Sequence, residues 1–208
     1  TDNIVIRGVD RQTVVLDGEH SEEMANGIIV FSNGVAVENL TVKNYFSNGV
    51  FFTGDYDSDF ILRGYRVSYV NALNNRVYGI YAFNAEYGLF DNTYAAGHTD
   101  SGYYIGQCQP CNAMLSNNLS EYNTLAYSGT NAGGDLFIVN NEFRMNRIGV
   151  TPNTLNSEEL APQRGATFAG NWIHSNGNPD TPKGGDIWEL AYGAVSYTHL
   201  RAHETEAY

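Results

Sequence analysis

One short stretch of the sequence gathers residue types that transfer protons. His98 and Asp100 are followed by the pair Tyr103 and Tyr104, so an imidazole, a carboxylate and two phenols fall within seven residues. Side chains of these types act as general acids and bases when they reach a reacting group. We therefore predict His98, Asp100 and Tyr104 as candidate catalytic residues. The alternative is a polar turn next to a tyrosine that packs in the core.

Three carboxylates alternate at Asp55, Asp57 and Asp59, as in the first half of a calcium-binding loop. The segment is not an EF-hand, because Phe60 stands where that loop needs glycine and Arg66 where it needs glutamate. A looser calcium site is one interpretation, and an acidic loop that contacts only water is the other. Calcium is the one cofactor that the sequence indicates.

The only two cysteines, Cys108 and Cys111, form a Cys-x-x-Cys motif. A redox motif of this type needs a βαβ context, and a zinc site needs a second pair of ligands; the sequence offers neither. We therefore predict a disulfide between Cys108 and Cys111 that closes a small loop in an exported protein. The alternatives are a pair of free thiols in a turn and a metal-binding pair.

Composition and charge exclude several classes of protein. The 208 residues carry Lys+Arg 11 and Asp+Glu 23, a formal net charge of −12, so we predict no nucleic-acid partner. The longest apolar runs, at residues 28–31 and 136–139, are too short to span a bilayer. The length and the 13% aromatic content fit one sizeable domain rather than a disordered chain.

Internal repeats are the strongest indication of the fold. Apolar segments led by glycine recur every 20 to 30 residues, which is typical of a solenoid. They begin at Gly27, Gly49, Gly79, Gly102, Gly129 and Gly149. Asparagines five residues apart lie between them, as at Asn118 and Asn123.

The short-range pattern indicates strands rather than helices. Apolar residues alternate at Val35 and Val37, and the alternation resumes in shifted phase at Leu40 and Val42 after Asn39. This pattern predicts two short strands joined by a sharp bend, where asparagine tolerates the left-handed conformation. The alternative, an antiparallel sandwich, needs longer strands with a turn about every 8 to 12 residues.

We therefore predict an all-β fold, a single-stranded right-handed parallel β-helix of about seven coils over residues 1–194. The asparagine bends should stack in one corner, at Asn39, Asn118, Asn141 and Asn171. Aligning the coils on the glycines then places an outward column of side chains between two apolar columns. That column comprises Ile29, Phe51, Tyr81, Tyr104, Asn131 and Thr151.

Flat rings spaced one coil apart can stack on the rings of a polysaccharide. We predict Phe51, Tyr81 and Tyr104 as substrate-binding rings, with Asn131 and Thr151 supplying hydrogen bonds. The alternative is that a neighbouring loop covers the aromatic side chains.

Residues 3–8 and 14–18 resemble the opening coil of pectin-lyase-like parallel β-helix repeat proteins, and residues 37–44 and 48–50 resemble their repeat unit. The resemblance covers nearly all of residues 1–194 and implies the fold. It implies no single activity, because this fold hosts lyases, hydrolases, epimerases and inactive members. The polygalacturonase motifs are incomplete: there is no Asp-Asp pair, no second glycine after His98 and no lysine after Ile148.

Residues 195–208 break the preceding pattern. Back-translation of residues 195–205 resembles an in-frame reading of a transposase adapter used in sequencing libraries. We therefore expect a non-native tail that does not continue the coils, and a β-helix that is truncated at this point.

Together these features predict an exported protein, secreted or held at the cell envelope, that binds or processes an extended polysaccharide on an outward strand face. One alternative is a polysaccharide lyase or epimerase that uses the segment from His98 to Tyr104. The other is a purely structural surface solenoid. The sequence leaves open whether the protein is an enzyme and what its oligomeric state is.

Overall fold

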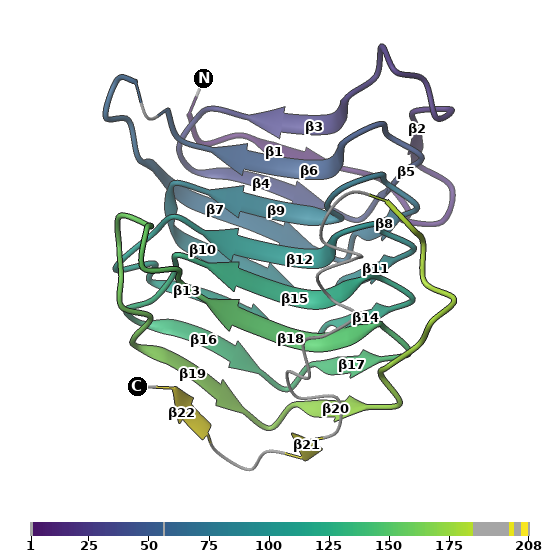
Figure 1. Cartoon of the computed structure of the whole chain (residues 1–208). Coiled ribbons are helices and arrows are strands. Elements are labelled where there is room, and N and C mark those ends of the chain that lie inside the picture. Colours follow the sequence, from purple (N-terminus) through teal and green to yellow (C-terminus); the bar gives the residue numbers. More distant parts are fainter. Residues whose placement is uncertain (1, 56, 185–199, 202–204, 208) are drawn as a thin grey trace.

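The chain winds into a parallel β-helix, with coils stacked from the N-terminus downward (Figure 1). The computed structural model describes residues 2–55, 57–184, 200–201 and 205–207. Each full coil contributes one short strand to each of three sheets, and this confirms the predicted all-β parallel architecture. Within these residues no helix is long and apolar enough to cross a membrane.

The three sheets are named here by the order in which a coil visits them. Sheet A contains β1 (Val5–Arg7), β4 (Val35–Glu38), β7 (Leu62–Ser68), β10 (Ala85–Asp91), β13 (Ala113–Ser116), β16 (Leu136–Val139) and β19 (Ala166–Ala169). Sheet B contains β2 (Val15–Asp17), β5 (Thr41–Lys43), β8 (Asn71–Leu73), β11 (Tyr94–Ala96), β14 (Leu119–Glu121), β17 (Glu142–Arg144) and β20 (Trp172–His174). Sheet C contains β3 (Asn26–Val30), β6 (Asn48–Thr53), β9 (Ile80–Phe83), β12 (Ser101–Gly106), β15 (Leu125–Thr130) and β18 (Ile148–Asn153).

Two further strands lie in the segment predicted to be a non-native tail. β21 (Leu200–Arg201) and β22 (Thr205–Ala207) pair antiparallel with β20 and β19, unlike every strand before them. The remainder of residues 195–208 lies outside the described residues.

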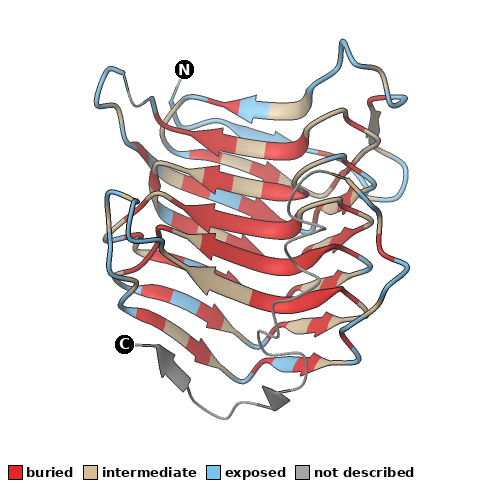
Figure 2. Cartoon of the chain, viewed as in Figure 1, coloured by how far each residue is buried: buried red, intermediate tan, exposed pale blue. Residues whose placement is uncertain are grey.

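The core fills the inside of the coils. Val35, Val37, Leu40 and Val42 are buried, as the alternation predicts, and the inward stripes continue along the strands (Figure 2). Burying an aliphatic side chain of this size contributes about 1.5–3 kcal/mol to the free energy of folding. The stacked apolar columns therefore hold the coils together and fix the outward columns between them.

The bend between sheets A and B is built from two adjacent columns of residues. The first column adopts positive φ in every coil from the second onward, at Asn39, Tyr69, Asn92, Asn117, Asn140 and Gly170. The second column, one residue later, is buried and contains Asn118, Asn141 and Asn171. The prediction that Asn39 stacks with these three was wrong, because the strand register places Leu40 in their column. Each bend therefore consists of a residue with left-handed backbone conformation followed by a residue whose side chain is buried.

The buried asparagines form a hydrogen-bonded ladder along the molecule. The Asn118 backbone N–H donates to the Asn141 side-chain oxygen, and the Asn141 N–H donates to Asn171, both at 3.0 Å. A second ladder follows sheet B and comprises Asn75, His98, Asn123, Asn146 and Asn176. The ladders satisfy backbone donors that the bends would otherwise leave buried and unpaired.

Candidate functional site

His98 is a rung of the second ladder and not an accessible catalytic group. It is fully buried, its Nδ1 accepts from the Asn75 N–H at 3.2 Å, and its Nε2 lies 3.1 Å from the Ala72 carbonyl. Burial lowers the pKa of the His98 imidazole to about 4, so the ring is neutral near pH 7. The structure therefore does not support the catalytic role predicted for His98.

Asp100 lies at the entrance to β12, where the chain passes onto sheet C. The Ser101 hydroxyl donates to its carboxylate at 2.6 Å, and Tyr78 forms a second side-chain hydrogen bond with it. Burial raises the pKa of the Asp100 carboxyl to about 6, although these hydrogen bonds oppose the shift. Asp100 is therefore half-ionised near pH 6 and mostly ionised at pH 7, where its carboxylate can act as a base.

Tyr104 belongs to a cluster of tyrosines on the outer face of sheet C, and Tyr78 of this cluster contacts Asp100. The Tyr104 ring centroid lies 5.0 Å from Tyr78 and 4.9 Å from Tyr81. Burial raises the pKa values of Tyr78 and Tyr81, and the nearby Asp100 charge adds to both shifts. These phenols therefore stay protonated and can donate hydrogen bonds or protons.

Tyr78 is a candidate site residue that the sequence analysis missed. It immediately precedes the repeat residue Gly79, and its N–H donates to the Asn48 side chain on the neighbouring strand at 3.3 Å. An aromatic residue just before a repeat glycine was the available signal. Its contact with Asp100 depends on the pairing of coils and is not visible in the local pattern.

The outward column on sheet C differs from its predicted membership at one position. Strand pairing aligns Tyr104 with Ser128 and Ser128 with Thr151, so Asn131 is not in the column. The error arose from aligning on Gly129, whereas Ala126 occupies the position equivalent to Gly102 and Gly149.

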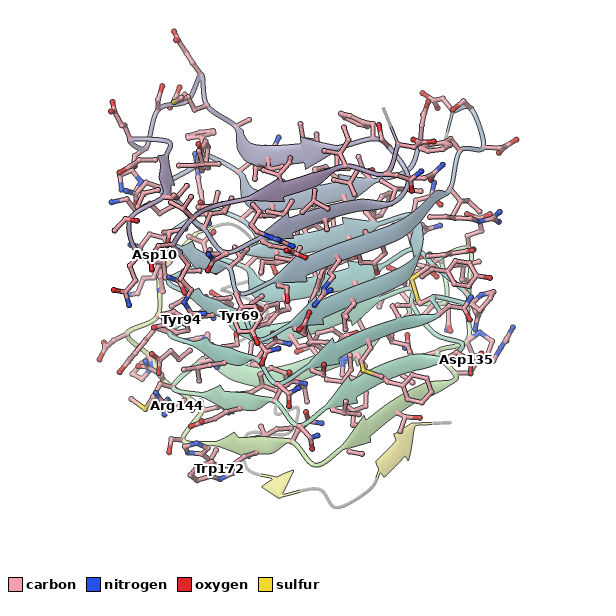
Figure 3. All side chains as sticks on the ribbon, turned by 180° about the vertical axis from the view of Figure 1, so that it is seen from behind. Asp10, Tyr69, Tyr94, Asp135, Arg144 and Trp172 are labelled. Carbon is pink, nitrogen blue, oxygen red and sulfur yellow. A yellow bond between two sulfur atoms is a disulfide. The ribbon has the colours of Figure 1, made fainter. Side chains whose placement is uncertain are left out.

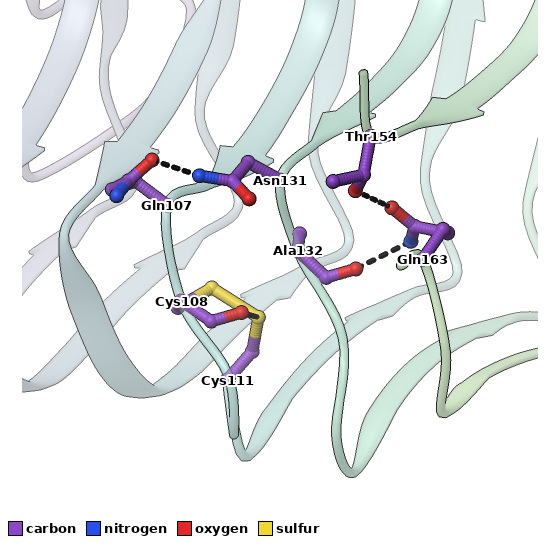
Figure 4. Close-up of a disulfide and its surroundings, with 7 residues drawn as sticks. All are labelled: Gln107, Cys108, Cys111, Asn131, Ala132, Thr154 and Gln163. Atoms are coloured by element: carbon purple, nitrogen blue, oxygen red, sulfur yellow. Dashed lines mark hydrogen bonds between the residues drawn. A yellow bond between two sulfur atoms is a disulfide. The ribbon is translucent and has the colours of Figure 1, made fainter. Parts of the chain in front are cut away.

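Asn131 lies instead in a bend. Its side-chain amide donates to Gln107 (Figure 4). Its side-chain oxygen accepts from the Leu160 N–H at 2.9 Å. The hydrogen bonds of Asn131 hold the loop after β18 against the coil, and they leave the predicted sugar-binding role of this residue without support.

The aromatic members of the column face outward but cover one another. Phe51 and Tyr81 stack with centroids 4.3 Å apart and planes 2° apart, and Tyr81 meets Tyr104 edge-on. Tyr104 is only 9% exposed. The column therefore offers ring edges and hydroxyls to a ligand rather than a row of open ring faces.

The predicted calcium ligands do not converge. The Asp55 carboxylate accepts from the Asp57 N–H at 3.0 Å and the Ser58 hydroxyl at 2.7 Å, and these bonds lower the pKa of Asp55. In the part of the chain that the structure describes, no three His, Cys, Asp or Glu side chains lie close enough to hold a metal ion. The acidic loop after β6 is stabilised by its own turn, and the calcium site is not supported.

Cys108 and Cys111 form a disulfide with an S–S distance of 2.14 Å (Figure 4). Both residues are buried in the core at the end of sheet C. The disulfide ties the turn between β12 and β13 and lies away from Asp100.

Comparisons with known proteins identify the fold. No protein-family model matches the chain, and no curated protein matches it either. Among solved structures, a mutant of the periplasmic alginate epimerase AlgG matches with a TM-score of 0.63 and 15% identity, over 86% of this chain and 41% of that chain. The A-module of the Azotobacter vinelandii mannuronan C-5 epimerase AlgE4 matches with a TM-score of 0.56 and 14% identity, over 85% of this chain and 53% of that chain. At this identity the likeness establishes the parallel β-helix fold alone.

Proposed function

We propose that this protein processes an extended polysaccharide on the outer face of sheet C, with Asp100 as the proton-transfer group. The observation that carries the proposal is the Asp100 carboxyl, with its pKa raised to about 6, in hydrogen-bond contact with Tyr78, whose ring lies 5.0 Å from that of Tyr104. The two structural neighbours are named as an alginate epimerase and a mannuronan C-5 epimerase. Epimerisation at a sugar carbon needs a base and a proton donor, and Asp100 and a tyrosine phenol can supply them.

The available groups favour proton abstraction over hydrolysis. Hydrolysis of a glycosidic bond generally uses two carboxyl groups on opposite sides of the bond. The six strands of sheet C contain no acidic residue, so Asp100 has no carboxyl partner on them. Removal of the proton next to the carboxylate of a uronic acid needs only one base and one proton donor.

In the proposed reaction, ionised Asp100 takes the proton from the sugar carbon. Tyr104 returns a proton to the opposite face of that carbon, which inverts its configuration, while Tyr78 stays hydrogen-bonded to Asp100. Tyr104 then regains a proton from solvent, and Asp100 releases the abstracted proton to solvent. If instead the C–O bond to the neighbouring glycosidic oxygen breaks as a carbon–carbon double bond forms, and the phenol protonates the leaving oxygen, the outcome is elimination. Both outcomes begin with the same Asp100 step.

We also propose that the protein is secreted or held at the cell envelope. The Cys108–Cys111 disulfide fits an oxidising compartment, where such bonds persist. The name of the AlgG neighbour places that protein in the periplasm, which agrees with this location.

The test is solvent isotope exchange. We would incubate the protein in D2O with alginate, polygalacturonate and a neutral β-glucan, then follow deuterium at the sugar carbons by NMR and unsaturated products by ultraviolet absorbance. Exchange or elimination should occur with a polyuronate, and Asp100→Asn should reduce the rate at least about a hundredfold. Asp57→Asn, in the exposed loop, is the matched control and should retain the parent rate. Binding without exchange in any polymer would overturn the catalytic proposal and leave a binding module.

A further inference from the structure

A second concave surface lies where sheet A bends into sheet B, on the side seen from behind in Figure 3. This rear groove has a volume of about 830 Å³ and crosses several coils. Figure 3 shows Tyr69 and Tyr94 toward one end of it and Trp172 toward the other. Residues that line the groove include Tyr69, Asn92, Asn117, Asn140, Glu142 and Trp172.

Two amides at the centre of the rear groove have no hydrogen-bond partner within the part of the chain that the structure describes. Asn117 and Asn140 occupy equivalent left-handed bend positions, with φ of 57° and 54°, in successive coils. Both are exposed, and among the described residues neither side chain makes a hydrogen bond. A carboxamide offers two donors and an acceptor, and neighbouring coils repeat them at about 4.8 Å. This is a row of hydrogen-bonding groups directed at solvent.

The ends of the rear groove present open aromatic surface, unlike sheet C. Trp172 is 51% exposed and Tyr69 is 52% exposed. His174 stacks against the Trp172 ring with centroids 4.0 Å apart, which fixes the indole and leaves it exposed to solvent on the groove side. Tyr94 is held by its hydrogen bond to Glu121 at 2.7 Å. Binding sites commonly combine such rigid apolar platforms with a few fixed polar groups.

We propose that the rear groove binds an extended, uncharged glycan, independently of the chemistry on sheet C. Sugar rings would stack on Trp172 and Tyr69, and sugar hydroxyls would pair with the Asn117 and Asn140 amides. The acidic group in the groove, Glu142, is already paired with Arg144 at 2.8 Å and lies 3.2 Å from His174. The described lining holds one cation, Arg11, which is too little positive charge to select a polyanion over a neutral glycan.

The experiment measures binding of a soluble neutral β-glucan, a neutral mannan and alginate by isothermal titration calorimetry and affinity electrophoresis. The first variant is Trp172→Ala, and the second combines Asn117→Gly with Asn140→Gly, since Gly170 shows that glycine suits this bend. Each should weaken binding of a neutral glycan at least tenfold, about 1.4 kcal/mol.

Matched controls carry the same changes outside the rear groove. Phe137→Ala removes a 37% exposed ring from sheet A. Asn74→Gly removes an exposed amide from the bend between sheets B and C, where Asn74 also has a left-handed backbone with φ of 52°. Both should bind within about twofold of the parent. Asp100→Asn should also bind normally, which separates this proposal from the catalytic one. Absence of neutral-glycan binding, binding of alginate only, or equal affinity in the groove variants would overturn the proposal.

Discussion

Adjacent asparagines at one corner of the β-helix have opposite environments. Asn118 and Asn141 point inward, are 3% and 2% exposed, and are bonded into a ladder. Asn117 and Asn140, one residue earlier, are exposed and have positive φ. In one column asparagine side chains accept hydrogen bonds from buried backbone N–H groups. In the next column asparagine adopts the left-handed conformation of the bend, and its amide is exposed to solvent.

This difference shows how a repeat can divide stability from recognition. The buried asparagines of the ladder cannot be replaced without leaving backbone groups unpaired. The exposed column needs only a residue that tolerates the left-handed region, so Tyr69 and Gly170 occupy it as well. A surface row can therefore change its side chains, and with them its ligands, on a constant ladder.

Replacing one buried asparagine of the ladder should have the largest effect on the free energy of unfolding. It is the strongest test of the difference between the buried and the exposed column. Asn141→Ala removes bonds from its amide to the Leu115 carbonyl at 2.9 Å and to Asn171 at 3.0 Å, and it leaves the Asn118 N–H unpaired. We expect a loss of about 4 kcal/mol in the free energy of unfolding, measured by denaturant titration. Asn140→Gly, the neighbouring surface change, should cost less than about 0.5 kcal/mol. Equal losses would remove the distinction between the columns.

The next effect concerns His98, the one rung that titrates. Its folded pKa of about 4 lies below the ordinary value of 6.5, so the unfolded chain binds more protons and stability falls as pH drops from 6.5 to 4. Asp100 acts in the opposite sense: its folded pKa of about 6 lies above 3.8, so stability falls as pH rises from 3.8 to 6. Each contribution is at most about 3 kcal/mol, and the two largely offset each other in the parent.

Single variants should separate the two titrations. His98→Asn places the residue type of the other rungs in the ladder, and its free energy of unfolding, relative to the parent, should decline from pH 4 to 6. Asp100→Asn should show the reverse, with stability that declines from pH 6.5 to 4. Denaturant titrations across this pH range measure both slopes, and slopes of the same sign in the two variants would contradict the assignment.

The smallest effect tests the exposed column by itself. Asn140→Ala should destabilise the protein by about 1 kcal/mol, because a residue with Cβ other than asparagine or aspartate is strained at φ of 54°. Asn140→Gly should cost less, since glycine adopts this region without strain. The difference between the two melting temperatures measures the backbone contribution, and identical values would show that the amide alone matters.

The fold could be predicted because its determinants are local and repeated. Alternation at Val35, Val37, Leu40 and Val42 marks two short strands and a bend, and repetition of the pattern every 20 to 30 residues implies stacking. The exact register could not be read in the same way. Gly129 resembles a repeat glycine, yet the coil uses Ala126 there, because the inward Tyr103 and Tyr127 pair across β12 and β15.

The sequence by itself determined the parallel β-helix, the columns that face outward on sheet C, and the presence of Asp100 and Tyr104 near one another. The tertiary structure decided which of these groups a ligand can reach. It buried His98 as a rung, added Tyr78 to Asp100, and assembled the rear groove from Tyr69 to Trp172. The physical reason is that contacts between coils join residues about one repeat apart, and a shift of one residue at a bend exchanges a buried position for an exposed one.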